Sequence, residues 1–420
     1  MNLLSPLKVR AFRFLYLGQV VSDLGNWMSF MALMILFTYH WKLPPEKLAL
    51  VPITLSLPWI LLSPFSGVWV ERFSKRNLMI FCDFIRSILS FSMLFTNNFW
   101  VLLVIICLIQ SAATFFDPAK QVAIKTYVPE PFLIKANALS QISLHLSKII
   151  APSIGGILIT IHNPSLVFMT NSVSFFLSAL LLMKLPKTDY SNSMLNKSKK
   201  GTFLKEIVTG FQKIFTNTLL CMAVCSMFFT TFLVFIYDSF IALWSKELGI
   251  AVSSFSLQIS GISLGSLLGA VIVGQFGNRI QPIKLLFISP FFIGLFFSII
   301  GLGGIHIVTF HEWLWLSIWS LIGFLGASIP ISYGTILQTT TPTIHLGKIY
   351  SSAQSILNIP TFVAPLIGAW IVRTLGIGYV FLLSGIFFTL FSITGLVILR
   401  RINRLNLDNN NGKKERTDVM

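Results

Sequence analysis

Charged residues are scarce in this chain of 420 residues. Asp, Glu, Lys and Arg together make up 11% of it, whereas soluble domains carry about 25%. Hydrophobic residues make up 55%, and the mean hydropathy is +0.80. A soluble core could not enclose that much apolar surface, because most of it would be left facing water. The composition therefore excludes a soluble globular protein and predicts a chain whose solvent is largely lipid.

Residues that bind metals or carry redox chemistry are also few: six His and four Cys. Cys221 and Cys225 are four residues apart in an apolar run, so a metal or redox site is one alternative, but small packing residues are the favoured interpretation. The sequence has no Gly-x-x-x-x-Gly-Lys-Ser/Thr phosphate loop, no His-Glu-x-x-His motif and no Gly-x-Ser-x-Gly motif. We expect no metal, no cofactor and no enzymatic activity.

Long apolar runs are what the chain has in abundance. A helix needs about 20 apolar residues to span the hydrocarbon of a bilayer. We predict twelve transmembrane helices, at 13–39, 48–70, 77–96, 99–118, 137–160, 164–184, 217–243, 255–277, 283–304, 313–334, 350–372 and 376–399. The predicted fold is an all-α membrane protein with a six-helix bundle at 1–190, a basic cytoplasmic linker at 191–213, a second six-helix bundle at 214–400 and a polar cytoplasmic tail at 401–420.

The net charge of +17 could indicate a nucleic-acid partner, but its distribution does not. If the N-terminus is cytoplasmic, only four of the 31 Lys and Arg residues fall in outer loops, namely Lys42, Lys47, Lys246 and Arg373. Cytoplasmic loops of membrane proteins carry an excess of Lys and Arg, which accounts for this asymmetry. We therefore expect both termini in the cytoplasm, no nucleic-acid partner, and no cleaved signal peptide.

The two halves of the sequence repeat each other. Gln141 and Gln354 are 213 residues apart, and so are Pro129 and Pro342 within longer matching stretches. Gly67 with Glu71 matches Gly274 with Asn278 at an offset of 207. Chance matches in apolar sequence would give scattered offsets, whereas these cluster. The pattern predicts two parallel six-helix repeats.

The stretch "GVWVERFSKR" resembles a loop of the major facilitator superfamily, written Gly-x-x-x-Asp-Arg-x-Gly-Arg-Arg and lying between the second and third helices. The matching positions are Gly67, Arg72, Lys75 and Arg76, while Glu71 and Ser74 replace the Asp and the second Gly. Residues 12–27, 115–141 and 151–158 resemble the macrolide-efflux and enterobactin-exporter branch. The resemblance implies the twelve-helix fold, the bacterial cytoplasmic (inner) membrane, and a conformational latch at this loop, with Asp83 and Arg86 beside it.

A polar stripe runs along the predicted fifth helix at spacings of three and four residues, which places its members on one helical face. They are Asn137, Gln141, His145, Lys148 and Pro152, and the eleventh helix repeats the stripe through Gln354 and Asn358. An ionisable group deep in a bilayer usually faces the protein interior or a wet cavity. We expect the stripe to line a central cavity; the alternative is that Lys148 only pairs internally.

The predicted first helix carries Gln19, Asp23 and Asn26 on one face, and Asp23 is expected at the depth of Lys148. A carboxylate is favoured beside an ammonium group, and losing that partner would make it take up a proton. One hypothesis is that Asp23 exchanges protons while Lys148 contacts the substrate; the other is a static ion pair. Asp117 and Asp238 are weaker candidates, because each lies close to a membrane interface.

Residues 147–156, "SKIIAPSIGG", resemble the antiporter signature of the superfamily. The matching positions are Pro152, Gly155 and Gly156. Pro removes a backbone hydrogen bond and small residues allow close helix contact, so we expect a hinge here. By this resemblance the chain favours export over import.

The resulting functional hypothesis is a secondary active transporter, expected to be monomeric among membrane lipids. It would export a small organic molecule, a siderophore or an amphipathic drug such as a macrolide, using the proton gradient. A slight preference for an anionic ligand rests on Lys148 and His145. The alternatives are a lysophospholipid or other lipid transporter of the same fold, and, in a different class, a transporter-like membrane sensor or a membrane enzyme.

Overall fold

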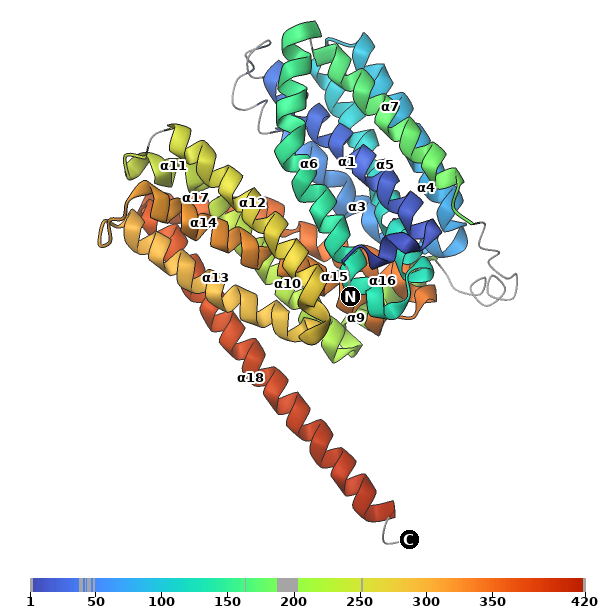
Figure 1. Cartoon of the computed structure of the whole chain (residues 1–420), viewed down its shortest axis with the longest axis vertical. Helices are drawn as coiled ribbons and strands as arrows, with labels where there is room; N and C mark the ends of the chain where they lie inside the picture. Colours follow the sequence, from blue (N-terminus) through green and yellow to red (C-terminus); the bar gives the residue numbers. More distant parts are fainter. Residues whose placement is uncertain are drawn as a thin grey trace.

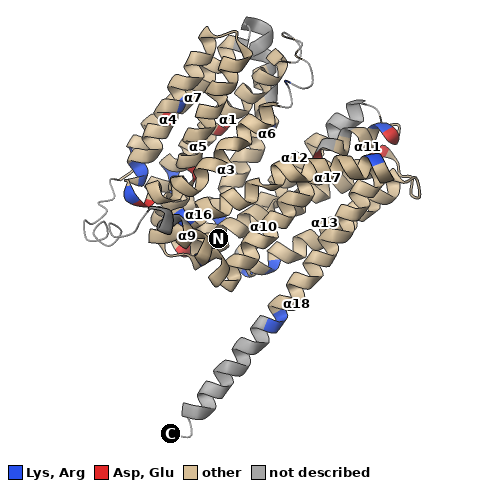
Figure 2. Ribbon diagram, turned by 180° about the vertical axis from the view of Figure 1, so that it is seen from behind, with Lys and Arg blue, Asp and Glu red and all other residues tan. Residues whose placement is uncertain are grey.

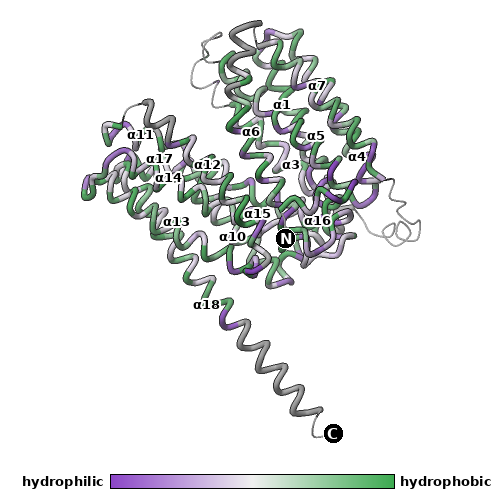
Figure 3. Tube along the Cα trace, in the orientation of Figure 1, coloured by the Kyte–Doolittle hydropathy of each residue, from purple (hydrophilic) through white to green (hydrophobic). Residues whose placement is uncertain are grey.

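The computed structural model describes residues 3–37, 41, 43, 47, 50–162, 164–186, 203–250 and 252–417. Within these residues, ten helical segments are long and apolar enough to cross a membrane. Two more long helices, α1 and α6, complete the predicted set of twelve; they carry Asp23 and Lys148, respectively. Figure 3 shows the apolar character of the bundle helices and the hydrophilic residues near their ends.

The first half contains six long helices. They are α1 (Arg10–Ile35), α3 (Leu50–Arg72), α4 (Lys75–Ser92), α5 (Phe99–Tyr127), α6 (Leu133–His162) and α7 (Pro164–Met183). The capping residue of α5 is Asn98, whose side chain accepts hydrogen bonds from the backbone N–H groups of Trp100 and Val101. Antiparallel α1 and α7 pack closely, since a Cβ atom at Gly18 would lie 3.0 Å from Ser178 Oγ.

The second half has six spans, two of which are divided. Its helices are α10 (Thr218–Tyr237), α12 (Val252–Phe276), α13 (Pro282–Gly304), α14 (Glu312–Gly326) with α15 (Ser328–Thr340), α16 (Thr343–Asn358) with α17 (Pro360–Leu375), and α18 (Ile377–Thr417). Proline at the first position of α17 cannot donate to the preceding turn, so the helix is interrupted at Ile359. A short helix, α11 (Ile241–Glu247), follows α10 and η5 (Asp238–Phe240).

The two halves meet at one end and diverge toward the other (Figure 1). Helix α3 packs against α16, and α12 packs against α6. A Cβ atom at Gly67 would lie 2.7 Å from Lys348 Cα, and one at Gly274 would lie 2.6 Å from the Cβ of Ala138. In the repeat, α3 corresponds to α12 at an offset of 207 residues, and α6 corresponds to α16 at an offset of 213. The contact of α3 with α16 is therefore equivalent to that of α12 with α6. The internal repeat therefore appears as two equivalent contacts between the halves.

The predicted linker and tail both contain helix. Residues 191–202 lie outside the described residues, but α9 (Phe203–Thr216) covers the end of the predicted linker. It packs on α16, where a Cβ atom at Gly210 would lie 2.5 Å from Ser352 Oγ. Helix α18 continues through the predicted tail to Thr417. Figure 2 shows Lys and Arg gathered at the end of the molecule that carries the N-terminus and α9.

Candidate functional site

An ion pair joins the halves where α3 meets α16. Glu71 Oε2 lies 2.5 Å from Lys348 Nζ, and the two side chains are only 7% and 11% exposed. Charges this far from water attract each other strongly, because little solvent screens them. At the equivalent contact between α12 and α6 the residue matching Glu71 is Asn278, which has no charge. The ion pair therefore marks only one of the two repeated contacts.

The backbones beside this ion pair lie close enough to exclude any side chain at Gly67. A Cβ atom there would lie 2.8 Å from the carbonyl oxygen of Gly347. Ser63 Oγ donates a 2.9 Å hydrogen bond to the carbonyl of Ser351, and Ser66 Oγ lies 3.1 Å from Ser351 Oγ. Gly67 thus permits a close helix contact that two buried serines complete, and Glu71 lies at its edge.

Lys75 and Arg76 of the predicted latch bind backbone carbonyls of the first half. Lys75 is buried and donates to the carbonyl of Phe73 at 3.2 Å, and Arg76 Nη2 donates to the carbonyl of Met183 at 2.5 Å. Arg72 is exposed at the end of α3. Gly67 and Glu71 therefore make the contacts of this loop with α16 that are described above.

Asp83 and Arg86 form a buried pair inside the first bundle. Arg86 Nη1 lies 3.2 Å from Asp83 Oδ1, and Ser178 Oγ of α7 donates to Asp83 Oδ2 at 2.6 Å. The guanidinium carbon lies 4.2 Å from the ring centroid of Phe175. All these partners belong to α4 and α7, so the pair joins helices of one half and does not contact the second half through these interactions.

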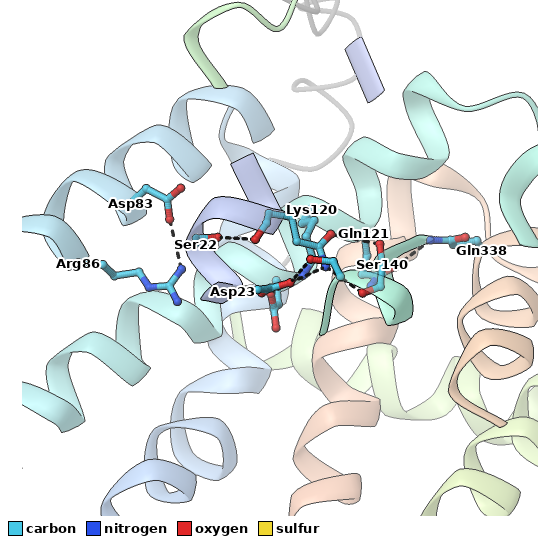
Figure 4. Close-up of polar contacts among 11 residues, drawn as sticks. Ser22, Asp23, Asp83, Arg86, Lys120, Gln121, Ser140 and Gln338 are labelled. Atoms are coloured by element: carbon cyan, nitrogen blue, oxygen red, sulfur yellow. Dashed lines mark hydrogen bonds and ion pairs between the residues drawn. The ribbon is translucent and has the colours of Figure 1, made fainter. Parts of the chain in front are cut away.

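A second polar contact joins the halves through Gln338 of α15, which is fully buried. Asn137 Nδ2 donates to Gln338 Oε1 at 2.8 Å, and Gln338 Nε2 donates to Gln121 Oε1 at 2.8 Å. Lys125 Nζ donates to the carbonyls of Gln338 and Thr341, at the end of α15. Because unpaired carbonyls end every helix, a lysine from the opposite half stabilises this one. Gln338 therefore fills a polar socket built by α5 and α6 (Figure 4).

Asp23 lies beside this socket, in a group of three charges from α1 and α5. Its carboxylate accepts hydrogen bonds from Ser143 Oγ at 2.7 Å and Gln19 Nε2 at 3.3 Å. Lys120 is the neighbouring cation (Figure 4), and it forms a 3.0 Å ion pair with Asp117. Two carboxylates and one ammonium give the group a net charge of −1, so a single proton makes it neutral.

The predicted contact between Asp23 and Lys148 is wrong in this conformation. Among the described side chains no ion pair joins them. Lys148 Nζ instead lies 4.8 Å from the ring centroid of Trp27, one turn beyond Asp23. The helix starts do not explain this, because α6 begins at Leu133 rather than 137 and α1 at Arg10 rather than 13, so both depths shift by nearly the same amount. The contacts show the offset: Asp23 meets Ser143 while Lys148 meets Trp27, so Lys148 lies about one helical turn, or about 5.4 Å, deeper than Asp23.

Lys148 interacts electrostatically with an acid of the second half. Its charge interacts with that of Asp238, which lies in η5 just beyond α10. Burial raises the pKa of the Asp238 carboxyl, and Lys148 lowers it in part. His145 is half-buried one turn before Lys148. The structure thus places a cation of the first half, held beside Trp27, within electrostatic reach of an anion of the second half.

Comparison with known proteins tests the predicted family. A family profile described as the Major Facilitator Superfamily matches residues 15–289 and 224–419. The chain belongs to the Major Facilitator Superfamily. The uncharacterized MFS-type transporter YfiS of Bacillus subtilis (strain 168) is 26% identical over 392 residues, covering 91% of each chain. Macrolide efflux protein A of Streptococcus pyogenes is 23% identical over 349 residues, covering 78% of this chain and 81% of its own.

A solved structure agrees with this assignment. The crystal structure of the human organic anion transporter MFSD10 has a TM-score of 0.72 at 13% identity, covering 93% of this chain and 100% of that one. The predicted major facilitator fold is confirmed. The chain is a multi-pass membrane transporter and not an enzyme, in agreement with its matched relatives.

The remaining predicted site residues of this facilitator lie on α1, α6 and α16. Asn26 and Gln141 are half-buried, and Asn358 Nδ2 donates to the carbonyl of Gln354 at 2.8 Å. At the predicted hinge, a Cβ atom at Gly155 would lie 3.6 Å from Met28, which is ordinary contact. Pro152 and Gly156 belong to α6, but their surroundings lie outside the described residues.

Sequence reasoning missed Lys120 and Lys348. The fourth helix is predicted to end at 118, so Lys120 is counted among the loop residues. In the structure α5 continues through Pro118 to Tyr127 and includes Lys120. The eleventh helix was expected to begin at 350, whereas α16 begins at Thr343. One signal could have found Lys348: it stands 213 residues after Lys135, the offset of the repeat. In the described part of the chain no cluster of metal-ligating side chains was found.

Proposed function

We propose that this facilitator is a proton-driven exporter of amphipathic organic molecules, and that it works by alternating access of its two halves. The observation that carries the proposal is the group formed by Asp23, Asp117 and Lys120. An uncompensated charge inside a bilayer is costly, so this group gains from one added proton, and the proton would be released when water reaches it. A group with those two states is what coupling to a proton gradient requires.

The end that carries residues 71–76 is assigned to the cytoplasm, because Lys and Arg concentrate there. With that orientation both termini are cytoplasmic, in the cytoplasmic membrane of a bacterium. The halves meet at this end, so the conformation described here faces outward. In the proposed export cycle the Glu71 and Gln338 contacts open and the substrate enters from the cytoplasm. The contacts then close again, and the substrate is released to the outside in the present conformation.

The substrate is proposed to bind between Lys148 and Asp238. Trp27 and Phe30, whose ring centroids are 5.7 Å apart, supply apolar surface beside the lysine. Because Asp238 contributes a negative charge, a cationic amphipathic compound is accommodated as well as an anionic one. The similarity to a protein named for macrolide efflux favours a macrolide over a siderophore. The energy source is the proton gradient alone, without a bound cofactor.

The test uses purified protein in liposomes with an imposed pH gradient and three radiolabelled probes: erythromycin, a catecholate siderophore and a lysophospholipid. We expect erythromycin to accumulate against its gradient only while the pH gradient lasts. Asp23→Asn is expected to abolish accumulation. Glu130→Gln, which removes an exposed carboxylate near the end of α5, serves as the control and should retain it. Accumulation of the siderophore or the lysophospholipid alone would contradict the proposed substrate.

A further inference from the structure

Three cations surround the ring of Phe14 near the start of α1. The Cζ atoms of Arg10 and Arg13 lie 6.0 and 5.8 Å from the ring centroid, and Lys184 Nζ lies 5.3 Å from it. The arginines come from the first turns of α1, whereas Lys184 directly follows the last residue of α7. The two arginines and Lys184, more than 170 positions apart in the chain, therefore bring positive charge to one aromatic side chain. We name these four residues the Phe14 cluster.

The Phe14 cluster is exposed and carries no carboxylate. Arg10, Arg13 and Lys184 are all exposed, and none of them forms an ion pair within the described part of the chain. Like charges gathered at one ring repel each other, whereas an anion placed among them would be attracted by all three. Guanidinium groups match the geometry of phosphate oxygens, to which they can donate two parallel hydrogen bonds. The cluster has the chemistry of a phosphate site.

Exposed apolar side chains continue from the cluster along the same two helices. Leu17 of α1 is 43% exposed, and Leu177 of α7, two helical turns before Lys184 on the same face, is 44% exposed. Leu17 lies about one helical turn deeper than Arg13, and Leu177 about two turns deeper than Lys184. Because α1 and α7 run antiparallel and pack closely at Gly18, these side chains lie on two adjacent helices, beyond the cluster in the direction of the membrane. A ligand filling both regions would have an anionic head and hydrocarbon chains.

The position of Lys184 is fixed by a neighbouring helix. Arg76 Nη2, at the start of α4, donates to the carbonyl of Met183 at 2.5 Å, which is the last residue of α7. A cation at a helix C-terminus is favoured by the helix dipole. The bond holds the end of α7 in place, and with it the third charge of the cluster.

We propose that the Phe14 cluster binds the phosphate of one anionic phospholipid whose acyl chains lie against α1 and α7. Recognition is by net headgroup charge: phosphatidylglycerol, whose phosphate charge is uncompensated, binds, and phosphatidylcholine with the same chains does not compete. Bound there, the lipid would hold the start of α1 to the end of α7. This inference concerns the outer surface of one bundle and does not depend on the transported substrate.

Native mass spectrometry of the full chain released from detergent tests the proposal. The protein is titrated with phosphatidylglycerol and, separately, with phosphatidylcholine of the same acyl chains. We expect wild type to retain one phosphatidylglycerol in preference to phosphatidylcholine. The variant Arg10→Gln/Arg13→Gln/Lys184→Gln should lose at least about tenfold in apparent affinity for phosphatidylglycerol, because each basic residue near a membrane contributes several-fold to the binding of anionic lipid.

A matched control removes three exposed cations of the second half. The variant Arg279→Gln/Lys284→Gln/Arg401→Gln has the same change in net charge and should keep the wild-type affinity. Arg10→Lys/Arg13→Lys keeps the charges and should retain most of the binding, which separates charge from misfolding. Equal losses in both triple variants, or equal retention of the two lipids by wild type, would overturn the proposal. Displacement of the lipid by millimolar inorganic phosphate would identify a free-anion site instead.

Discussion

The ion pair between Glu71 and Lys348 allows a quantitative prediction for Glu71→Gln. The two groups are 2.5 Å apart and almost fully buried, so the carboxylate contributes a charge-assisted hydrogen bond worth about 1.5–3 kcal/mol. When this end opens, water solvates both groups, and the contribution is lost. Taking about 2 kcal/mol, we expect the substitution to shift the equilibrium between closed and open cytoplasmic ends about 30-fold toward open.

Distances between spin labels measure that shift. Labels at Phe73 and Ile280 lie on exposed positions of the two halves, and the four native cysteines are replaced beforehand. Glu71→Gln should add a population with a longer distance. The charge exchange Glu71→Lys/Lys348→Glu should restore the short distance, since it rebuilds the pair in reverse. A distance distribution unchanged by Glu71→Gln, or an exchange variant as open as the single one, would refute the reasoning.

Three further predictions concern the contacts between the halves and the substrate site. Gly67→Ala places a Cβ atom within 2.8 Å of backbone atoms and should destabilise the closed end by about 1–3 kcal/mol, measured with the same spin labels. Gly155→Ala, whose Cβ atom has room, should leave the label distances unchanged. Gln338→Ala removes two buried hydrogen bonds of 2.8 Å and should cost about 2 kcal/mol of closure; an unaltered closed fraction would contradict the role of the socket. Because burial raises the pKa of Asp238, its negative charge disappears at a higher pH than that of an ordinary carboxyl group. Binding of tetraphenylphosphonium, measured by calorimetry, should therefore weaken as the pH falls through that raised pKa, and Asp238→Asn should bind weakly at every pH.

The fold was predictable because the thickness of a bilayer fixes how long each apolar run must be. The repeat was visible because both halves keep glycine where α3 and α12 approach the opposite half. Gly67 has no room for a side chain, since a Cβ atom there would clash with the backbone of α16. Because only glycine fits at these close contacts, the matching glycines in both halves could be recognised from the sequence alone.

The partners of the charged residues were less predictable. Which side chains meet depends on helix rotation and on shifts of one turn, and predicted helix ends are uncertain by about that much. Asp23 was expected beside Lys148, but Ser143 and Lys120 occupy its surroundings. Lys120 was counted as a loop residue because the fourth span was predicted to end at 118, whereas α5 continues to Tyr127. Proline is tolerated inside membrane helices, where neighbouring helices can satisfy the freed carbonyl.

The most direct test of proton coupling measures proton movement with the substrate. Purified protein is reconstituted in liposomes containing a pH-sensitive dye, and erythromycin is added without an imposed gradient. Proton-coupled export predicts that erythromycin moves protons in the opposite direction across the wild-type membrane, and that Asp23→Asn moves none while Glu130→Gln behaves as wild type. Erythromycin transport without any proton movement in wild type would contradict the account.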